Sequence, residues 1–308
     1  MFNENDIKLM KDTIEAQLGK LELDYCKAYG TLDLPKSEEG VLALDKLVDT
    51  QNLIYKIEGK PETATRETIL NELDYFEGLR DERRYHIDSG IFANGLKMNY
   101  ENRLAIFEFE IKLIKSGYIR GIVKNELKYT PNYFFYVPAS SSGRYHPDYA
   151  QGAGGLVRHT IAAVKTAVEL MRLEQYADEL NQQRDTIKDE IIAALILHDT
   201  YKCGLEDIDA GKFESYKTKS NHPVLAHDQL LKHQISGNNK ARMSALTESI
   251  ADLILTHMGQ WNTDRDTGEE IMPKPETFAQ KFVHMCDYIA SRKNIEVCVY
   301  NPKAYSNR

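Results

Sequence analysis

The sequence lacks the long apolar runs and the cysteine framework that would indicate a membrane protein or a disulfide-stabilised secreted domain. A membrane-spanning helix needs roughly 18 or more consecutive apolar residues, whereas the longest run here covers only residues 191–197. The four cysteines are scattered, with no Cys-x-x-Cys pair, and the first residues show no basic segment followed by an apolar one. These features predict reduced thiols and no secretory signal, so we expect a cytoplasmic protein.

Concentrated positive charge is also missing. The formal net charge is −8, and no run of Lys or Arg is longer than two residues. A protein that binds nucleic acid mainly by neutralising phosphates is expected to carry a basic patch, so the composition disfavours that class. Anionic substrates stay open, because bound metal ions can supply positive charge locally. With 42% hydrophobic and 28% charged residues, the 308-residue chain can bury a sizeable core.

The first part of the chain, residues 1–128, predicts a helical region without a chemical motif. Apolar residues recur three or four positions apart, the spacing of amphipathic helices, in the segments 7–28, 41–57, 65–83 and 99–116. The segment 129–149 is rich in Pro, Ser and aromatic residues and has no helical period, although a short strand is an alternative at 132–137. We therefore place a domain boundary at 129 and expect residues 1–128 to form a scaffold or an oligomerisation arm, which leaves a homo-oligomer open.

The second part, residues 129–308, predicts a further succession of helices, so the expected fold class is all-α. The predicted segments are 156–175, 185–202, 223–234, 243–258 and 275–295. Several of the nine histidines stand on the apolar stripes of these helices instead of on polar faces. His159 precedes Ala163 by four positions, and His257 follows Leu253 by four, so each imidazole is expected to face a helix core.

Buried acidic groups accompany these histidines. The doublet His198-Asp199 closes the apolar run 191–197, and Asp287 follows Val283 by four positions. Burying a carboxylate or imidazole without a partner costs several kcal/mol, which is explained if the groups share a cation. Mixed imidazole and carboxylate ligands suit Mn, Fe, Co, Mg or Zn. Neighbouring helix positions point about 100° apart, so other helices must supply further ligands, while Lys202 is expected on the same side as Asp199.

Five segments of this half resemble the motifs of the HD-domain superfamily of metal-dependent phosphohydrolases, over roughly residues 145–295. In chain order they read GGLVRHT, LHDTYK, NHPVLAHD, LTHMGQW and HMCDYIASRK. Within that superfamily, GGLVRHT and THMG look most like the HD domains of 3′-to-5′ exoribonucleases and of small stand-alone proteins in phages and mobile elements. The resemblance implies a helical HD-domain bundle with an additional N-terminal helical region, which hydrolyses phosphomonoester or phosphodiester bonds.

The resemblance also implies a site with two divalent metal ions. Its ligands would be His159, His198, Asp199, His222, His257 and Asp287. Asp199 would bridge the two ions, and Lys202 would stabilise charge on the phosphoryl group, so these two are the expected catalytic residues. His227 is an alternative to His222 as a ligand. We prefer His222, because the sequence Asn-His-Pro places it at a helix start.

Substrate contacts are expected next to the first ligand and in the loop before it, with a packing role as the alternative. The candidates are Arg158, Arg144, Tyr145 and His146. Tyr129 and the aromatic residues at 133–136 are candidates for base stacking or for the core. The first hypothesis is hydrolysis of a nucleotide-type substrate, the second a 3′-to-5′ exonuclease on single-stranded nucleic acid, and the third a metal-containing nucleotide sensor without turnover. The acidic composition favours the first.

Overall fold

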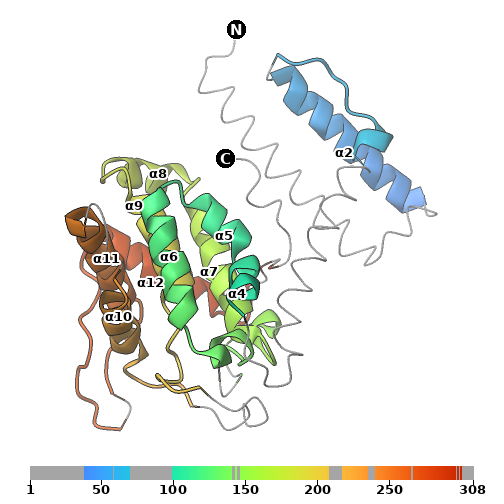
Figure 1. Cartoon of the computed structure of the whole chain (residues 1–308). Coiled ribbons are helices and arrows are strands. Elements are labelled where there is room, and N and C mark those ends of the chain that lie inside the picture. The colour runs from blue at the N-terminus through green and yellow to red at the C-terminus, as the bar shows by residue number, and fades with distance from the viewer. Residues whose placement is uncertain are drawn as a thin grey trace. The chain divides into compact units, whose positions relative to one another are not determined.

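The computed structural model describes residues 38–57, 59–69, 99–140, 143, 146–207, 217–234, 240–264, 266–295, 297 and 299. Figure 1 shows helices throughout these ranges. They contain no strand, only one isolated β-bridge between Thr263 and Glu270, so the all-α prediction is confirmed. The helix predicted at 7–28 and most of the one predicted at 65–83 lie outside the described residues.

The chain divides into two compact units, and the described residues up to 69 belong to the first. Its main element is helix α2 (Glu38–Ile57), which contains the helix predicted at 41–57. The chain then turns back along α2, and the side-chain amide of Asn52 pairs with both backbone polar groups of Ala64 at 2.8 and 3.0 Å. Local hydrogen bonds of this kind fix the returning segment on its helix.

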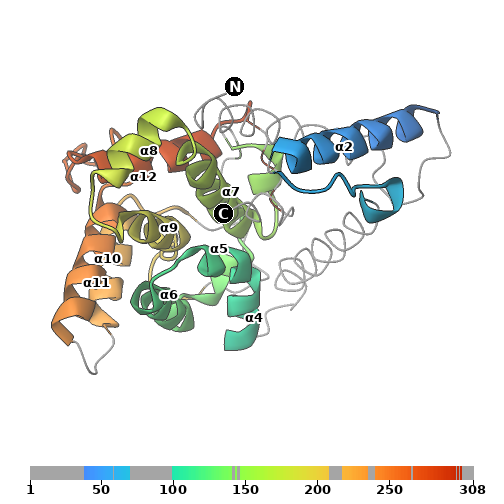
Figure 2. The same cartoon turned by 90° about the horizontal axis from the view of Figure 1, so that it is seen from above.

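The second unit, to which the described residues from 99 onward belong, is a helical bundle. Its helices are α4 (Tyr100–Ile106), α5 (Glu108–Leu113), α6 (Gly117–Tyr129), α7 (Gly155–Leu170), α8 (Glu174–Asn181), α9 (Ile187–Leu197), α10 (His222–Lys232), α11 (Lys240–Leu255) and α12 (Phe278–Ala290). Helix α9 contacts α5, α6, α7, α11 and α12, and Figure 2 shows it lying among them. Because residues 191–197 of α9 are apolar on all sides, its central position follows from its sequence.

Each helix predicted after residue 155 overlaps an observed one, but the ends differ. The helix predicted at 156–175 ends at Leu170, and α8 begins only four residues later. The helix predicted at 185–202 ends at Leu197, just before the His-Asp doublet. The polar pair therefore stands on the turn that leaves α9, where the backbone of His198 is still helical.

The segment before residue 129 belongs to the same bundle. Helix α6 packs against α9, and the backbone N–H of Ser116 donates a hydrogen bond to the Asp189 carboxylate at 2.7 Å. The buried guanidinium of Arg103 donates to the carbonyls of Leu127 and Thr130 at the end of α6. The compact unit thus reaches back across the boundary predicted at 129.

Two local predictions in this region are wrong. The helix predicted at 99–116 is interrupted at Phe107, whose backbone is not helical and whose fully buried ring stacks on Phe134 at a centroid distance of 6.0 Å. The strand considered for 132–137 is instead a short 3₁₀ helix, Asn132–Phe135. The aromatic side chains at 133–135 are buried, so these three residues belong to the core and are not available to stack on bases.

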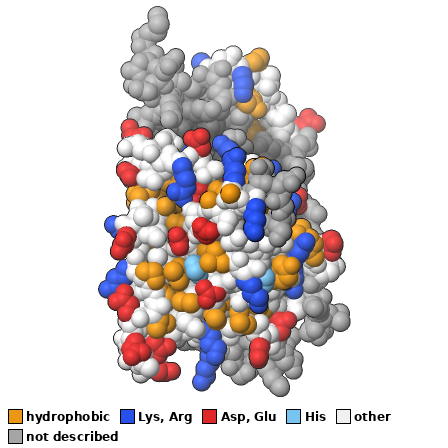
Figure 3. All heavy atoms as spheres, turned by 60° about the vertical axis from the view of Figure 1, so that its left-hand side comes forward, with side chains coloured by type: hydrophobic (Ala, Val, Ile, Leu, Met, Phe, Trp, Pro, Cys, Tyr) orange, Lys and Arg blue, Asp and Glu red, His pale blue; other side chains and the backbone are white. Residues whose placement is uncertain are grey.

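Among the described residues, no helix is long and apolar enough to cross a membrane. Figure 3 shows one face of the molecule, on which Lys and Arg side chains alternate with Asp and Glu and with scattered hydrophobic groups. On this face the charges of the two signs are mixed instead of being gathered into a basic track.

A buried carboxylate joins α9 to α11. Glu190 is fully buried and accepts hydrogen bonds from Arg184, Thr186 and Ser249. Burial by itself raises the pKa of Glu190, but these donors outweigh it and hold the pKa below its usual range. Because the folded-state pKa is lowered, the stabilisation is present above the unfolded-state pKa and is lost as pH falls through the folded-state value.

We expect Glu190→Gln to lower the free energy of unfolding by about 2 kcal/mol at neutral pH, because charge-assisted hydrogen bonds to a buried carboxylate are lost. Urea denaturation followed by circular dichroism measures this. The difference from the wild type should shrink at acid pH, because the carboxyl group becomes protonated as pH falls through its folded-state pKa. Glu174→Gln, at an exposed carboxylate of α8, is the matched control and should change little. An equal loss at both pH values would contradict the charge network.

Candidate metal centre

Helices α7, α9, α10, α11 and α12 bring together six polar side chains that the sequence predicts as metal ligands. They are His159 in α7, His198 and Asp199 directly after α9, His222 at the start of α10, His257 just after α11, and Asp287 in α12. The four imidazoles and Asp199 are at most 1% exposed, and the side chain of Asp287 is 16% exposed. The arrangement is therefore a closed polar cluster in the middle of an apolar bundle.

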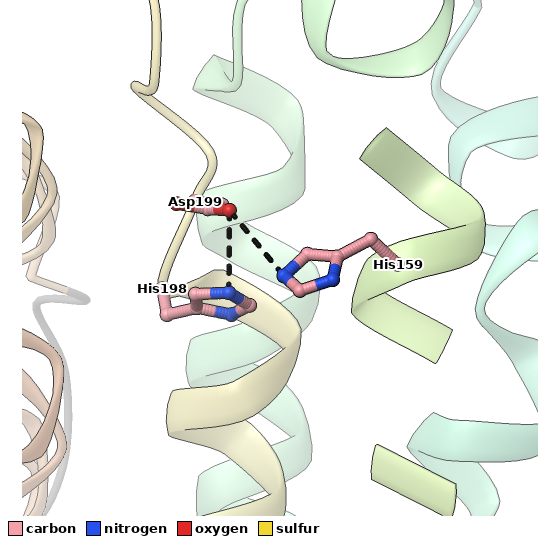
Figure 4. A group of neighbouring side chains, drawn as sticks. All are labelled: His159, His198 and Asp199. Carbon is pink, nitrogen blue, oxygen red and sulfur yellow. Dashed lines mark ion pairs between the residues drawn. The ribbon is translucent and has the colours of Figure 1, made fainter. Parts of the chain in front are cut away.

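The first group of ligand atoms surrounds one oxygen of each carboxylate. The Nε2 atom of His159 lies 2.9 Å from Asp287 Oδ1 and 3.8 Å from Asp199 Oδ2. The Nε2 atom of His198 lies 3.3 Å from Asp199 Oδ2 and 3.6 Å from Asp287 Oδ1. Figure 4 shows how the rings of His159 and His198 approach Asp199 from two different helices.

The second group surrounds the other oxygen of Asp199. The Nε2 atoms of His222 and His257 lie 3.0 and 3.8 Å from Asp199 Oδ1. The same two nitrogens are 3.2 Å apart. Asp199 is therefore common to both groups, with one carboxylate oxygen turned to each.

Backbone carbonyls orient three of the imidazoles. The Nδ1 atom of each ring is within hydrogen-bond distance of the carbonyl three residues earlier: Leu195 for His198 at 2.7 Å, Lys219 for His222 at 2.8 Å, and Ile254 for His257 at 2.7 Å. A carbonyl only accepts, so Nδ1 carries the proton and Nε2 of a neutral ring presents a lone pair to the cluster. Sequence patterns did not identify these carbonyls, since backbone groups have no residue signature. The one signal was the position of His198 and His257 at helix ends, where carbonyls are free.

Such an arrangement is unfavourable without a positive charge in it. Lone pairs of His222 and His257 would face each other and Asp199 Oδ1 at short distance, and Asp199 Oδ1 and His198 Nε2 are buried without a hydrogen-bond partner among the described residues. Buried polar atoms without partners cost free energy. Imidazole nitrogens and carboxylate oxygens are ligands for Mn, Fe, Co, Mg or Zn, so the residues fit one or two divalent cations.

The two carboxylates dominate the electrostatics of the cluster. Burial raises the pKa of both Asp199 and Asp287, but other groups outweigh it and hold both values well below the usual range: Lys202 and neighbouring imidazoles for Asp199, and imidazoles alone for Asp287. Burial lowers the pKa of His198, yet the carboxylates outweigh this and raise it to about 10. Burial and the neighbouring imidazoles lower the pKa of His257 to about 3. A proton on His198 thus supplies positive charge in the absence of a cation, and a bound cation would take its place.

Lys202 stands at the edge of the cluster. Its ammonium group contacts Asp199 Oδ2 at 2.5 Å, and the residue is 9% exposed. The turn after α9 brings it there, because the backbone N–H of Lys202 donates to the carbonyl of Asp199. A largely buried cation beside the shared carboxylate can reach an anionic group that approaches the cluster.

The second candidate ligand on α10, His227, lies apart from the cluster. Its Nδ1 atom is 2.8 Å from the carboxylate of its neighbour Asp228, and the side chain is 20% exposed. His222 and His227 are five positions apart, so they point to different sides of the helix. Of the two alternatives, only His222 lies close enough to Asp199 to share a metal ion with it.

The candidate substrate residues differ in their surroundings. The guanidinium of Arg158 donates to the carbonyls of Tyr149, Gln151 and Ala153, so it holds the preceding loop instead of facing the cluster. Arg144 and Tyr145 lie outside the described residues. His146 does lie beside the cluster.

The ring of His146 packs edge-on against that of His159 at a centroid distance of 5.3 Å. Its Nδ1 atom is buried without a hydrogen-bond partner in the described part of the chain. Burial and the positive charges of His159 and Lys202 lower the pKa of His146 to about 3. A neutral imidazole with an unused nitrogen is therefore available beside the first ligand group.

His222 and His227 provide a matched pair of variants on one helix. We expect His222→Ala to weaken metal binding by at least about tenfold, because it removes one of the two imidazole nitrogens that lie near Asp199 Oδ1. His227→Ala should retain the metal content of the wild type. Plasma mass spectrometry after dialysis against each metal measures the effect. Equal metal content in both variants would exclude the second ligand group.

A family model described as the HD domain matches residues 156–291, the segment that contains all six clustered residues. Comparison with curated proteins and with solved structures finds no match to either. HD domains bind divalent metals, and the two ligand groups described above could do so here. This match supports the membership of residues 156–291 in the HD-domain superfamily of metal-dependent phosphohydrolases.

Proposed function

We propose that this protein is a hydrolase that cleaves a phosphoester bond of a nucleotide-type substrate with water activated at the cluster. The observation that carries the proposal is the convergence of four imidazoles on two carboxylates, with Asp199 common to both groups and Lys202 beside it. The HD domain supports the reaction class. Phosphoryl transfer requires charge stabilisation more than covalent chemistry, and this site concentrates charged groups where water is excluded.

The clustered residues would form two adjacent cation sites. His159, His198 and Asp287 with Asp199 would hold one cation, and His222 and His257 with Asp199 would hold the second. Bound divalent cations lower the pKa of a coordinated water and neutralise phosphoryl oxygens. The carbonyls behind the imidazoles keep each ring in one tautomer and one orientation.

Lys202 would stabilise the negative charge that develops on the phosphoryl group. Its ammonium is already held by Asp199 at the edge of the cluster, so little reorientation is needed when an anion arrives. His146 has a buried, unused nitrogen on the same side and is the candidate for a hydrogen bond to the substrate. Arg158 is not included, since its donors are engaged by backbone carbonyls.

A small nucleotide is favoured over a nucleic-acid strand as the substrate. The net charge of −8 and the mixed charges visible on the face in Figure 3 do not favour long-range attraction of a polyanion. The buried positions of Tyr133, Phe134 and Phe135 also remove the aromatic cluster that would stack successive bases. The exonuclease alternative still predicts stepwise shortening of single strands, which the same assay detects.

The first experiment is an activity panel with protein exchanged separately into Mn, Mg, Co, Fe and Zn. Substrates are mononucleotides, triphosphates, cyclic dinucleotides and short single-stranded RNA and DNA, and chromatography separates the products. We expect metal-dependent hydrolysis of one nucleotide class, abolished in Asp199→Ala because both ligand groups lose their common carboxylate. Stepwise shortening of strands would instead support the exonuclease. Bound metal without turnover on any substrate would overturn the proposal in favour of a sensor.

A second prediction separates catalysis from metal binding. We expect Lys202→Met to lower kcat roughly 100- to 1000-fold, because an electrostatic donor to the transition state is lost, while metal content stays near that of the wild type. Lys232→Met, in the last turn of α10, is the matched control and should leave kcat unchanged. Steady-state kinetics together with metal analysis of the same samples decides the matter. If Lys202→Met kept its kcat, the ammonium would have only a structural role.

A further inference from the structure

Two exposed aromatic side chains lie against each other, on chain segments that also carry residues of the cluster. Trp261, in the segment after α11, is 43% exposed, and Tyr288 of α12 is 37% exposed. Their ring centroids are 5.6 Å apart with planes inclined by 12°, so the rings are stacked. Leaving two large aromatic surfaces in water forgoes hydrophobic stabilisation, and such a surface is a candidate for ligand contact.

A cation accompanies the aromatic pair. The guanidinium carbon of Arg292 lies 4.2 Å from the ring centroid of Tyr288 and 6.0 Å from that of Trp261. The hydroxyl of Ser291 accepts a hydrogen bond from the same guanidinium at 2.9 Å. The aromatic pair and Arg292 together, here called the aromatic platform, combine flat apolar faces with one positive charge.

Both chain segments of the platform also carry residues of the histidine and aspartate cluster. Tyr288 directly follows the ligand Asp287 in α12, and Trp261 lies four residues after the ligand His257. His284 joins the two segments: its Nδ1 donates to the carbonyl of His257 at 2.7 Å, and its ring lies 6.0 Å from that of Trp261.

Close packing fixes this connection. Gly259, between His257 and Trp261, has a positive φ of +59°, and a Cβ at this position would overlap the ring of His284. The absence of a side chain lets the turn after α11 lie directly on α12. The aromatic platform is thus held at a set position relative to the ligands.

We propose that the aromatic platform binds the nucleobase of the substrate whose phosphate lies at the cluster. The proposal rests on the function proposed above and deepens it by assigning the base-binding residues. Every nucleobase has a flat π-face that stacks on aromatic side chains, and Arg adds a cation–π contribution and a charge complementary to phosphate. Stacking tolerates different bases, so we expect larger bases to bind more tightly without strict selection of one base.

Tryptophan fluorescence tests this directly, because Trp261 is the only tryptophan of the chain. The metal-loaded protein is titrated with adenosine monophosphate, with ribose 5-phosphate, which lacks the base, and with a short single-stranded DNA. We expect saturable quenching by adenosine monophosphate and none by ribose 5-phosphate. Quenching by the DNA alone would still assign a base to the platform, but as the end of a strand. Equal responses to the two monophosphates, or no response to any ligand, would overturn the proposal.

Variants separate stacking from a general structural effect. Tyr288→Ala should raise the Kd for adenosine monophosphate by at least about fivefold, whereas Tyr288→Phe should restore most of the affinity. Trp261→Ala should raise KM for the nucleotide with a smaller change in kcat. Tyr129→Ala is the matched control, because Tyr129 is also exposed, at 53%, but stacks on His233 instead. A Kd unchanged by Tyr288→Ala would contradict the assignment.

The two proposals fail separately. Base-dependent quenching in a protein that hydrolyses none of the substrates would leave the platform assigned and refute the hydrolase. Metal-dependent hydrolysis of a nucleotide, with Trp261 emission and KM indifferent to the base, would refute the platform and leave the hydrolase intact.

Discussion

Asp199 carries a negative charge at a position where water scarcely reaches it, and much of the bundle is arranged to make that charge tolerable. A buried carboxylate is strongly disfavoured unless it is paired. Here Lys202 contacts one oxygen, and imidazoles from three other helices approach both oxygens. The charge is therefore compensated only while each of these helices keeps its position. The buried apolar surface of α9 fixes the position of Asp199, which follows its last turn.

Helix ends provide the means of orienting the partners. His198 and His257 follow the last residues of α9 and α11, where backbone carbonyls have no N–H partner within the helix. Each ring lies within hydrogen-bond distance of the carbonyl three residues earlier, and the Ile254 carbonyl also accepts the backbone N–H of His257. One hydrogen bond thereby contributes to the helix terminus and also sets the direction of Nε2. A substitution that extended either helix would lose both effects.

The sequence was sufficient for the fold class and for the helices that carry the clustered histidines and aspartates, because the apolar stripes and the helix-start signal at His222 are local features. It was insufficient where long-range packing decides. Phe107 interrupts a continuous helical pattern because its ring is needed against Phe134, which is distant in sequence. The direction of the Arg158 side chain likewise depends on loop carbonyls that no spacing reveals. The composition change at 129 does not separate α6 from the later helices, since α6 packs on α9.

Helix α12 relates the chemical centre to the aromatic platform by simple geometry. Asp287 and Tyr288 are successive residues, so their side chains point about 100° apart, one into the cluster and one toward solvent. A substrate that contacts both must span the edge of this one helix, and neither contact can shift without the other. Selection then depends on the distance between the phosphoryl group and the flat part of the substrate. Under the proposed function, a phosphoester without a stacking group would reach the cluster but gain nothing from the aromatic pair. The aromatic pair would then discriminate between substrates by affinity, and the proposed metal ligands would determine the rate of the chemical step.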